Sequence, residues 1–176
     1  MLNGIIIMGL NGSGKSTICH ELADVLNYRR IDVEDYYFLD SAIPYTKSRT
    51  REEVKKLMLD DIKFYQNYVL SSVGCDWGSE IVSTYRLAII LYAPLQVRLE
   101  RIKQREITRF GNRVLEGGDM HESQKRFHDM VKSRSAENIK EQASSLDCPV
   151  LEINSTLPVK EIIGLIYSYY LNIFDE

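Results

Sequence analysis

The stretch GLNGSGKST, from Gly9 to Thr17, combines residue types that bind phosphate. It matches the pattern G-x-x-x-x-G-K-[ST] in full, in which glycines turn backbone N–H groups toward phosphate oxygens. The lysine of the pattern reaches the β- and γ-phosphates, and the next hydroxyl ligates Mg²⁺. We therefore expect ATP, with Lys15 on its phosphates and Ser16 on its Mg²⁺. The residues predicted to bind the nucleotide here are Gly9, Asn11, Gly12, Ser13, Gly14, Lys15, Ser16 and Thr17.

The surroundings of this stretch fit the mechanism, which needs a strand before the loop and a helix after it. The preceding residues, NGIIIMG, form a continuous apolar run ending at a glycine, as expected for a strand buried on both faces. The following residues, STICHELADVLN, place Ile18, Leu22, Val25 and Leu26 at helical spacing. The segment therefore predicts a nucleotide site rather than a chance glycine turn.

Three acidic residues follow the second predicted strand, in Ile31-Asp32-Val33-Glu34-Asp35. Acids at the carboxyl end of a parallel strand face the same crevice as the phosphate loop. A carboxylate there can orient or deprotonate an acceptor hydroxyl, or hold a water molecule of Mg²⁺. We assign Asp32 to catalysis and place Glu34 and Asp35 beside the acceptor. The sequence leaves open which acid points inward, and at least one is expected to cap the following turn.

Arginines recur every four residues at Arg101, Arg105, Arg109 and Arg113, and Arg134 follows on a later helix. The guanidinium fork matches phosphate oxygens and can stabilise a phosphoryl group in transfer. We assign Arg105 and Arg109 to catalysis and nucleotide binding, and Arg113 and Arg134 to the acceptor. For Arg101 we favour a solvated helix face, because Glu100 and Glu106 lie close by in the sequence.

The composition bounds the class of protein. The chain has 176 residues, enough for one domain with a proper core, and a net charge of −3, which argues against a broad basic surface for nucleic acid. Its three cysteines have no metal-ligand spacing, and no apolar run is long enough for a signal peptide or a membrane span. We expect a cytoplasmic monomer or homodimer without nucleic-acid or membrane partners.

Strands alternate with helices along the sequence, which predicts an α/β fold with a parallel sheet between two helix layers. We expect a single domain over residues 1–176, with a short mobile lid-like segment at about 105–120. The strands are expected at 3–9, around Ile31 and running into a loop, and at 68–73, 87–93 and 148–155. The main helices are expected at 16–27, from a Thr50–Glu53 capping box onward, and at 95–106, 123–143 and 159–174.

Two other classes of nucleotide-binding protein fit less well. A guanine-nucleotide switch usually adds N-K-x-D and D-x-x-G elements, and neither occurs in this chain. A motor ATPase would need an apolar strand ending in two acids, and residues 57–61, LMLDD, have those letters. They lie within the segment that begins at Thr50, where the apolar spacing is helical, so Asp60 and Asp61 are predicted to be helix-surface charges.

Three segments together resemble the adenylate kinase and shikimate kinase group of small P-loop kinases. They are GLNGSGKST, LAIILYAPLQVRLERIKQRE and VLEINSTLPVKEIIGLI, and the similar layout covers essentially the whole chain. The resemblance implies a three-layer P-loop fold, a lid whose arginines clamp the phosphates, and a final strand whose loop, with Asn154, Ser155 and Thr156, touches the base. It also aligns Asp32-x-Glu34 with the D-x-D pair of shikimate-type kinases.

The same resemblance places Asp76, just after the third strand, where an acid often reaches Mg²⁺ through water; a turn aspartate fits equally well. It places Arg49, in PYTKSRTR, where the acceptor enters, and this favours an anionic acceptor; a basic loop on an acidic protein fits equally well. The D-G-F-P-R signature of adenylate kinase is absent. We expect an ATP-dependent phosphotransferase acting on a nucleoside monophosphate or a hydroxyl metabolite. The alternative is an ATP sensor or a partner-stimulated ATPase.

Overall fold

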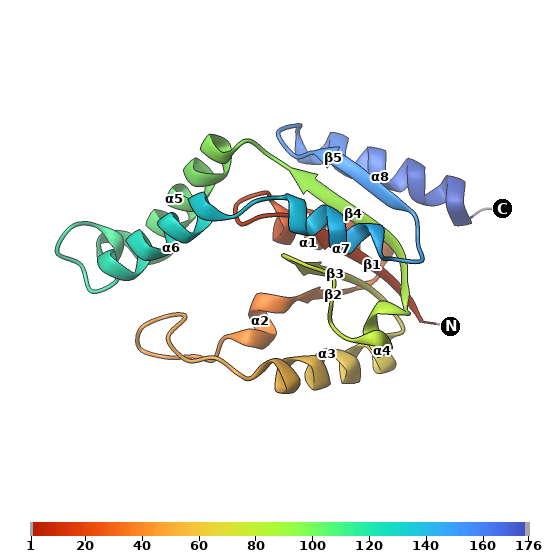
Figure 1. Ribbon diagram of the computed structural model, residues 1–176, viewed down its shortest axis with the longest axis horizontal. Coiled ribbons are helices and arrows are strands. Elements are labelled where there is room, and N and C mark those ends of the chain that lie inside the picture. The colour runs from red at the N-terminus through yellow and green to blue at the C-terminus, as the bar shows by residue number, and fades with distance from the viewer. Residues whose placement is uncertain (1, 175–176) are drawn as a thin grey trace.

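The computed structural model describes residues 2–174, and its elements alternate between strands and helices (Figure 1). The strands are β1 Asn3–Met8, β2 Arg29–Asp32, β3 Asn67–Ser72, β4 Tyr85–Tyr92 and β5 Val150–Asn154. The helices are α1 Lys15–Leu26, α2 Val33–Tyr37, α3 Arg51–Tyr65, α4 Ser79–Val82, α5 Leu95–Phe110, the 3-10 helix η1 Gly111–Val114, α6 His121–Ser133, α7 Glu137–Ser144 and α8 Val159–Phe174.

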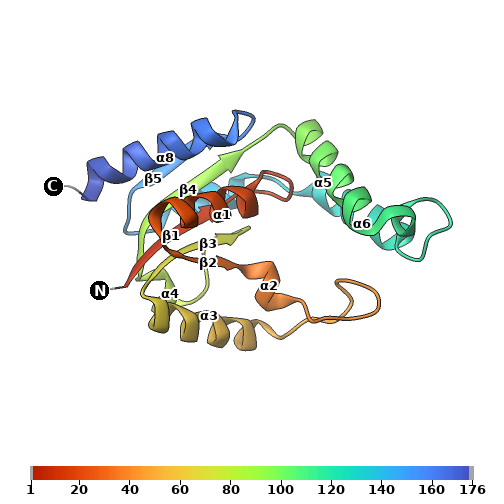
Figure 2. The ribbon, with the colours of Figure 1, turned by 180° about the vertical axis from the view of Figure 1, so that it is seen from behind.

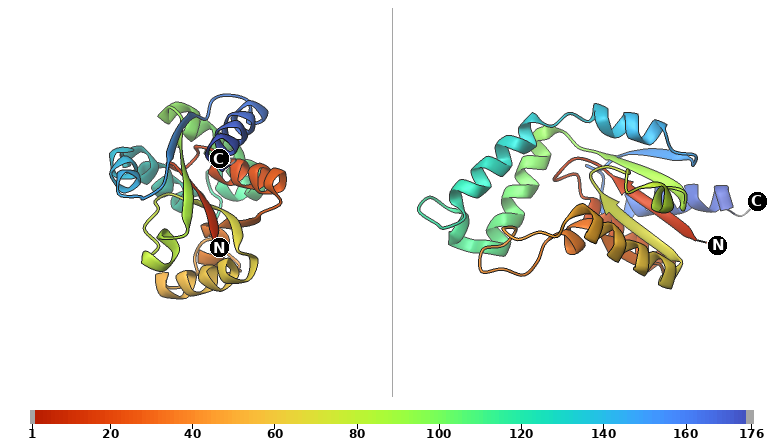
Figure 3. Two further views of the ribbon diagram at one scale, coloured as in Figure 1. Left: turned by 90° about the vertical axis from the view of Figure 1, so that its right-hand side faces the viewer. Right: turned by 60° about the horizontal axis from the view of Figure 1, so that its bottom comes forward.

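The five strands form one parallel sheet in the order β2-β3-β1-β4-β5. The central strand β1 is buried on both faces, since Ile5 and Ile7 point to one side while Ile6 and Met8 point to the other. Helices α1 and α8 cover the first side, and α3, α4 and α7 cover the second (Figure 3). The predicted three-layer α/β fold is therefore confirmed.

The capping box predicted at Thr50 is present and begins α3. The Glu53 backbone N–H donates to Thr50 Oγ1 at 3.3 Å, and the Thr50 backbone N–H donates to Glu53 Oε2 at 2.8 Å. Asp60 and Asp61 lie on this helix, as its apolar spacing predicted. The acid pair therefore does not end a strand.

Two predicted elements differ from the structure. The chain after β2 forms the short helix α2 instead of a loop, because the Asp32 carboxylate caps it by accepting the Glu34 backbone N–H at 3.2 Å. The helix predicted over 123–143 is two helices, α6 and α7. Arg134 between them is extended (φ −77°, ψ 130°), and Ser135 Oγ accepts the Glu137 backbone N–H at 3.1 Å, which starts α7 in a new direction.

Helices α5 and α6 lie side by side and project beyond the sheet as an arm (Figure 1 and, from behind, Figure 2). The segment 38–49 projects from α2 toward the same end of the molecule. Most of the predicted lid segment is helical, because α5 continues to Phe110 and ends at Gly111 (φ 55°), and η1 follows. None of the helices within residues 2–174 is long and apolar enough to cross a membrane.

Candidate functional site

A cleft of about 1080 Å³ opens between the carboxyl ends of the strands, the α5 arm and the segment 38–49. Cavities for one ligand are usually about 300–1000 Å³, so this volume is slightly larger than that range. The end next to α8, called the base end because the nucleotide base is expected there, is lined by Arg101, Ser155, Leu157, Val159 and Ile162. The middle is lined by residues 11–18, from the phosphate loop and the start of α1. Its far end is lined by Glu34, Asp35, Phe38 to Ser41, Pro44, Tyr45, Arg105, Arg109 and Phe110.

The phosphate loop holds its shape through glycine conformations that other residues rarely adopt. Gly12 has φ 80° and Gly14 has φ 95°, and Gly14 caps the amino end of α1. A Cβ on Gly12 would lie 2.5 Å from the carbonyl oxygen of Arg98, so the loop is also packed against α5. Ser13 is fully buried, and its backbone N–H closes the loop by donating to the Leu10 carbonyl at 3.1 Å. The amino end of α1 thus presents free N–H groups to the cleft, as anion binding requires.

Lys15 lies at the centre of the cleft, where its Nζ donates to the Leu10 carbonyl at 3.2 Å. Desolvation by burial lowers the pKa of Lys15 from 10.5 to about 8. The carboxylates of Glu34 and Asp32 oppose this shift, and the Arg105 and Arg134 guanidinium groups add to it. Four charged side chains from three segments therefore act on one ammonium group, and an anion placed there would restore its full charge.

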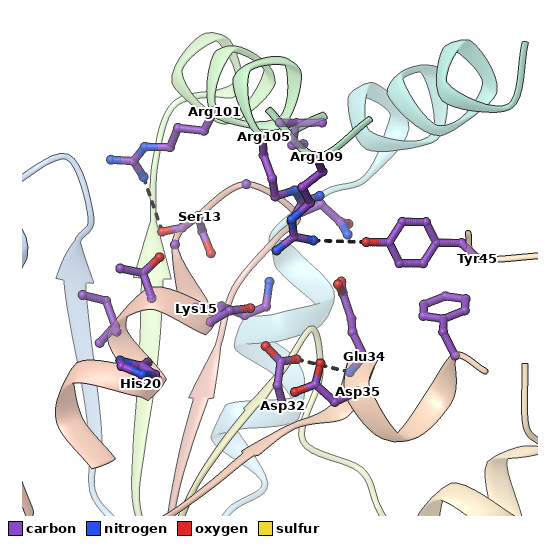
Figure 4. A pocket seen from close by; sticks show the side chains of 18 of the residues that line it. Ser13, Lys15, His20, Asp32, Glu34, Asp35, Tyr45, Arg101, Arg105 and Arg109 are labelled. Atoms are coloured by element: carbon purple, nitrogen blue, oxygen red, sulfur yellow. Dashed lines mark hydrogen bonds between the residues drawn. The ribbon is translucent and has the colours of Figure 1, made fainter. Parts of the chain in front are cut away.

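The acids predicted after β2 take different positions around the cleft. Asp32, Glu34 and Asp35 all line it, and Figure 4 shows Asp32 and Glu34 close to Lys15. Asp32 is 8% exposed and also caps α2, so it is fixed in place. Asp35 is more exposed and pairs with Arg30 at 2.8 Å. Asp32 is therefore the most firmly fixed of the three acids beside the phosphate loop.

The oxygen groups at this point fit a Mg²⁺ ion. Ser16 lies in the first turn of α1, and both Ser16 and Asp32 line the cleft. A hydroxyl and a carboxylate are hard oxygen donors, and Mg²⁺ is usually bound by one or two protein groups together with nucleotide phosphates and water. Beside Asp32 in the sheet register lies Ser71, whose buried Oγ has no hydrogen-bond partner. These residues fit the predicted metal, and Ser16 stays its predicted direct ligand.

Three of the predicted arginines reach the site, two of them from α5 and one from the junction of α6 and α7. Arg105 and Arg109 line the cleft and extend from α5 toward Lys15 and Glu34 (Figure 4). Arg134 comes from the junction of α6 and α7, and its Nη1 donates to Asn11 Oδ1 at 2.7 Å. The structure thus brings three of the predicted arginines around the phosphate loop.

Like Gly9 and Arg134, three more predicted residues are not among those that line the cleft. Arg113 is bound by Asp119 at 2.8 Å and donates to the Ala42 carbonyl at 3.1 Å, so it joins the arm to the segment 38–49. Arg49 donates to the Tyr36 carbonyl at 2.8 Å, within the base of that segment. The exposed Asp76 pairs with Arg51 at 3.6 Å and accepts the Gly78 backbone N–H at 3.3 Å, as a turn aspartate does.

Two arginines that were not assigned to the site contact the phosphate loop directly. Arg98 is 5% exposed, and its Nη1 donates to the Asn11 carbonyl at 3.2 Å. Arg101 donates to the carbonyl groups of Ser13, at 3.5 Å, and Ser155, at 2.8 Å, so it joins the loop to the base end of the cleft. The expectation that Arg101 is a solvated helix charge is therefore wrong. The spacing 98, 101, 105, 109 places all four arginines on one face of α5. This spacing was the sequence signal that could have assigned Arg98 and Arg101 to the site.

Of the residues predicted near the nucleotide base, one lines the cleft and another closes a turn. Ser155 lines the cleft, but its Oγ already donates to the Tyr92 carbonyl at 3.0 Å, so its side chain is structural. Asn154 Oδ1 accepts the Thr156 backbone N–H at 3.0 Å and closes the turn before α8. The surface that is left for a base is apolar, from Leu157, Val159 and Ile162.

Comparison with known proteins places the chain in a family. Residues 5–124 match the family model described as an AAA domain. The uncharacterized protein YqaC of Bacillus subtilis (strain 168) is 33% identical over 177 residues, which cover 96% of this chain and 98% of that protein. A motor ATPase would need an apolar strand that ends in two acids. Within residues 2–174, the strand β3, which pairs with β1, ends at Ser71 and Ser72 instead.

Solved structures share the fold at low sequence identity. A sugar kinase from Janibacter sp. HTCC2649 has a TM-score of 0.56 at 15% identity, covering 99% of this chain and 96% of that one. Shikimate kinase from Aquifex aeolicus vf5 has a TM-score of 0.53 at 18% identity, covering 96% of both chains. The predicted resemblance to small P-loop kinases is thus confirmed. The chain belongs to the AAA-domain family of P-loop proteins, and its fold is that of the small P-loop kinases.

Proposed function

We propose that the protein is an ATP- and Mg²⁺-dependent phosphotransferase that moves the γ-phosphate of ATP to a small anionic acceptor. The observation that carries the proposal is the charge arrangement around Lys15. Its ammonium group is under the joint influence of Glu34 and Asp32 from the β2–α2 junction, Arg105 from the arm and Arg134. A site that only held a nucleotide would not need cations on an arm and acids on the opposite wall.

The two ends of the cleft support a division between donor and acceptor. ATP would place its base against the apolar residues of the α8 end, where the planar guanidinium of Arg101 can stack on a ring. Its phosphates would lie on the loop N–H groups and Lys15. The acceptor would enter from the side of Tyr45 and Arg109, so that the γ-phosphate lies between the two ligands.

The reaction requires positioning and charge neutralisation more than covalent chemistry. An acceptor oxygen attacks the γ-phosphorus, the bond from that phosphorus to the β–γ bridging oxygen breaks, and its electron pair leaves with ADP. Lys15, Arg105 and Arg109 neutralise the charge on the phosphoryl oxygens during transfer. Ser16 and Asp32 would hold Mg²⁺, which would supply further charge neutralisation there. An acceptor hydroxyl would lose its proton to Asp32 or Glu34.

The test is ADP release from Mg-ATP across a panel of nucleoside monophosphates, sugar acids, shikimate and nucleosides. We expect one chemical class to raise turnover strongly, and Lys15→Ala to abolish that turnover. Lys63→Ala, an exposed lysine of α3 on the outer surface, is the matched control and should behave as the unmodified protein. Tight ATP binding without stimulation by any acceptor would contradict the proposal and favour a sensor, and stimulation by protein alone would favour a partner-dependent ATPase.

A further inference from the structure

The acceptor end of the cleft carries an aromatic wall made of Phe38, Tyr45 and Phe110. The ring of Tyr45 meets that of Phe38 at 4.8 Å and 79°, and that of Phe110 at 6.1 Å and 89°, so both contacts are edge-to-face. Phe38 and Tyr45 belong to the segment 38–49, whereas Phe110 ends α5. The wall therefore exists only where the segment and the arm approach each other.

Tyr45 occupies a backbone conformation that is unusual for its residue type. Its φ is 65°, in the left-handed region that bulky residues rarely adopt, and it follows Pro44. Such conformations persist where the surroundings over-determine them, and they gather at ligand-binding segments. Here the segment is closed by the Leu39 backbone N–H, which donates to the Lys47 carbonyl at 3.0 Å. The Tyr45 side chain contacts Phe110 and Arg109 of the arm while 40% of the residue stays exposed.

The hydroxyl of Tyr45 connects the wall to the cations. It accepts a hydrogen bond from Arg109 Nη1 at 3.1 Å (Figure 4). Arg105 lies one helical turn earlier on the same face of α5 and also lines the cleft. An acceptor held here would meet ring faces and edges on one side and two guanidinium groups on the other.

These surfaces suit a planar ring that carries an anionic group. Aromatic side chains stack on rings, and the Phe38 and Phe110 side chains have no group that could pair with the hydroxyls of a polyol such as a sugar acid. A phosphate monoester matches the arginine forks. The combination of ring and phosphate is the chemistry of a nucleoside monophosphate.

We propose that the wall of Phe38, Tyr45 and Phe110 is a ring-binding acceptor subsite, and that the acceptor is a nucleoside monophosphate whose phosphate is held by Arg105 and Arg109; this rests on the proposed function. A phosphate oxygen of the acceptor attacks the γ-phosphorus of ATP, the bond to the β–γ bridging oxygen breaks, and ADP leaves with the electron pair. The products are ADP and a nucleoside diphosphate. Because the acceptor phosphate is already a dianion, no proton has to be removed.

The test compares ligands that differ only in the ring. Calorimetry in saturating Mg-ADP measures the binding of AMP, GMP, CMP, UMP and ribose 5-phosphate, which has the phosphate and the sugar but no base. We expect at least one nucleoside monophosphate to bind about tenfold to a hundredfold more tightly than ribose 5-phosphate, the range that base stacking on an aromatic side chain supplies. The same nucleotide should be the one that stimulates ADP release from ATP.

Three variants assign that preference to the wall. Tyr45→Leu and Phe110→Leu should remove most of the ring preference, and the KM for ATP should change less than about twofold. If the wall instead contacted the adenine of ATP, the same variants would raise the KM for ATP. Tyr45→Phe should keep the ring preference, because it loses only the contact with Arg109. Phe64→Leu is the control, since Phe64 is 79% exposed on α3 and is not among the cleft residues.

The outcomes separate this inference from the proposed function. Equal binding of ribose 5-phosphate and every nucleoside monophosphate, or phosphorylation of sugar acids alone, would overturn the ring subsite and leave the phosphotransferase standing. A ring preference that depends on Tyr45 without any ADP release would support the subsite and overturn the transferase. A rise in the KM for ATP in both Leu variants would assign the wall to ATP and contradict the inference.

Discussion

The two ends of the cleft are built in different ways. The phosphate loop joins an almost fully buried strand to a helix, and the buried Arg98 holds it by donating to the Asn11 carbonyl. The acceptor end is formed by exposed segments that meet through side chains, such as Tyr45 with Arg109 and Arg113 with the Ala42 carbonyl. One end is fixed by the core, and the other depends on a few surface contacts.

This difference indicates where the protein can change its shape and its specificity. Contacts between exposed groups contribute little stability and open easily, so we expect the arm and the segment 38–49 to separate when ligands enter. The phosphate loop has no such freedom, because its movement would disturb the packing of α5 and β1. Substitutions at the two ends should therefore have different signatures, and four experiments address this.

The largest expected effect is on phosphoryl transfer. Arg105→Ala should lower kcat about 100- to 1000-fold, because it removes a cation that lies near Lys15 and that we propose to face the γ-phosphate. Arg113→Ala should change kcat less than about threefold, because that guanidinium is taken up by Asp119 and the Ala42 carbonyl. Steady-state kinetics with the best acceptor measures both. Equal losses in the two variants would show that the arm acts as a single unit.

The next largest effect is expected on stability and ATP binding when the phosphate loop is changed. Gly12→Ala should lower the free energy of unfolding by about 1–3 kcal/mol and weaken ATP binding, since a Cβ would meet the Arg98 backbone at a positive φ. Gly14→Ala is the matched variant, because its φ is also positive but its nearest neighbour would be Arg101 Nη1 at 3.8 Å. Urea unfolding should rank Gly12→Ala as the less stable. A reversed ranking would exclude packing on α5 as the constraint.

The pH dependence of ATP binding should follow Lys15. In the free protein its pKa is about 8, and phosphate binds the protonated form, so the Kd for ATP should rise about tenfold between pH 7 and 9. The unfolded chain holds more protons than the folded one between about pH 8 and 10.5, so Lys15 adds a rise in stability across that window. Calorimetry checks the first effect, and Lys15→Ala should flatten it. A flat profile in the unmodified protein would refute the assignment.

The smallest effect is expected on stability when the cap of α3, next to the segment 38–49, is removed. Thr50→Ala removes the cap of α3 and should lower the free energy of unfolding by about 1 kcal/mol. Because Thr50 lies outside the cleft, the KM for ATP should stay constant. Thermal unfolding and ATP kinetics on the same sample measure both. A changed KM for ATP would mean that the two ends of the cleft are coupled through α3.

Local patterns in the sequence predicted most of the fold. The apolar run before Gly9 predicted β1, the pattern G-x-x-x-x-G-K-[ST] predicted the phosphate loop, and the Thr50 capping box predicted the start of α3. Each of these features depends on neighbours within a few residues of the chain. Their geometry follows from backbone preferences and helix capping, which a short segment expresses by itself.

Contacts between distant residues could not be predicted in the same way. Arg98 and Arg101 had the sequence signature of a charged helix surface, and only the packing of α5 against the phosphate loop gives them partners. The break between α6 and α7 and the approach of Tyr45 to Phe110 also arise between segments far apart in the chain. The sequence by itself determined the sheet, the phosphate loop and the nucleotide it suits. The tertiary structure decided which charges and rings line the cleft beside the phosphate loop, because side-chain partners are set by packing and not by local periodicity.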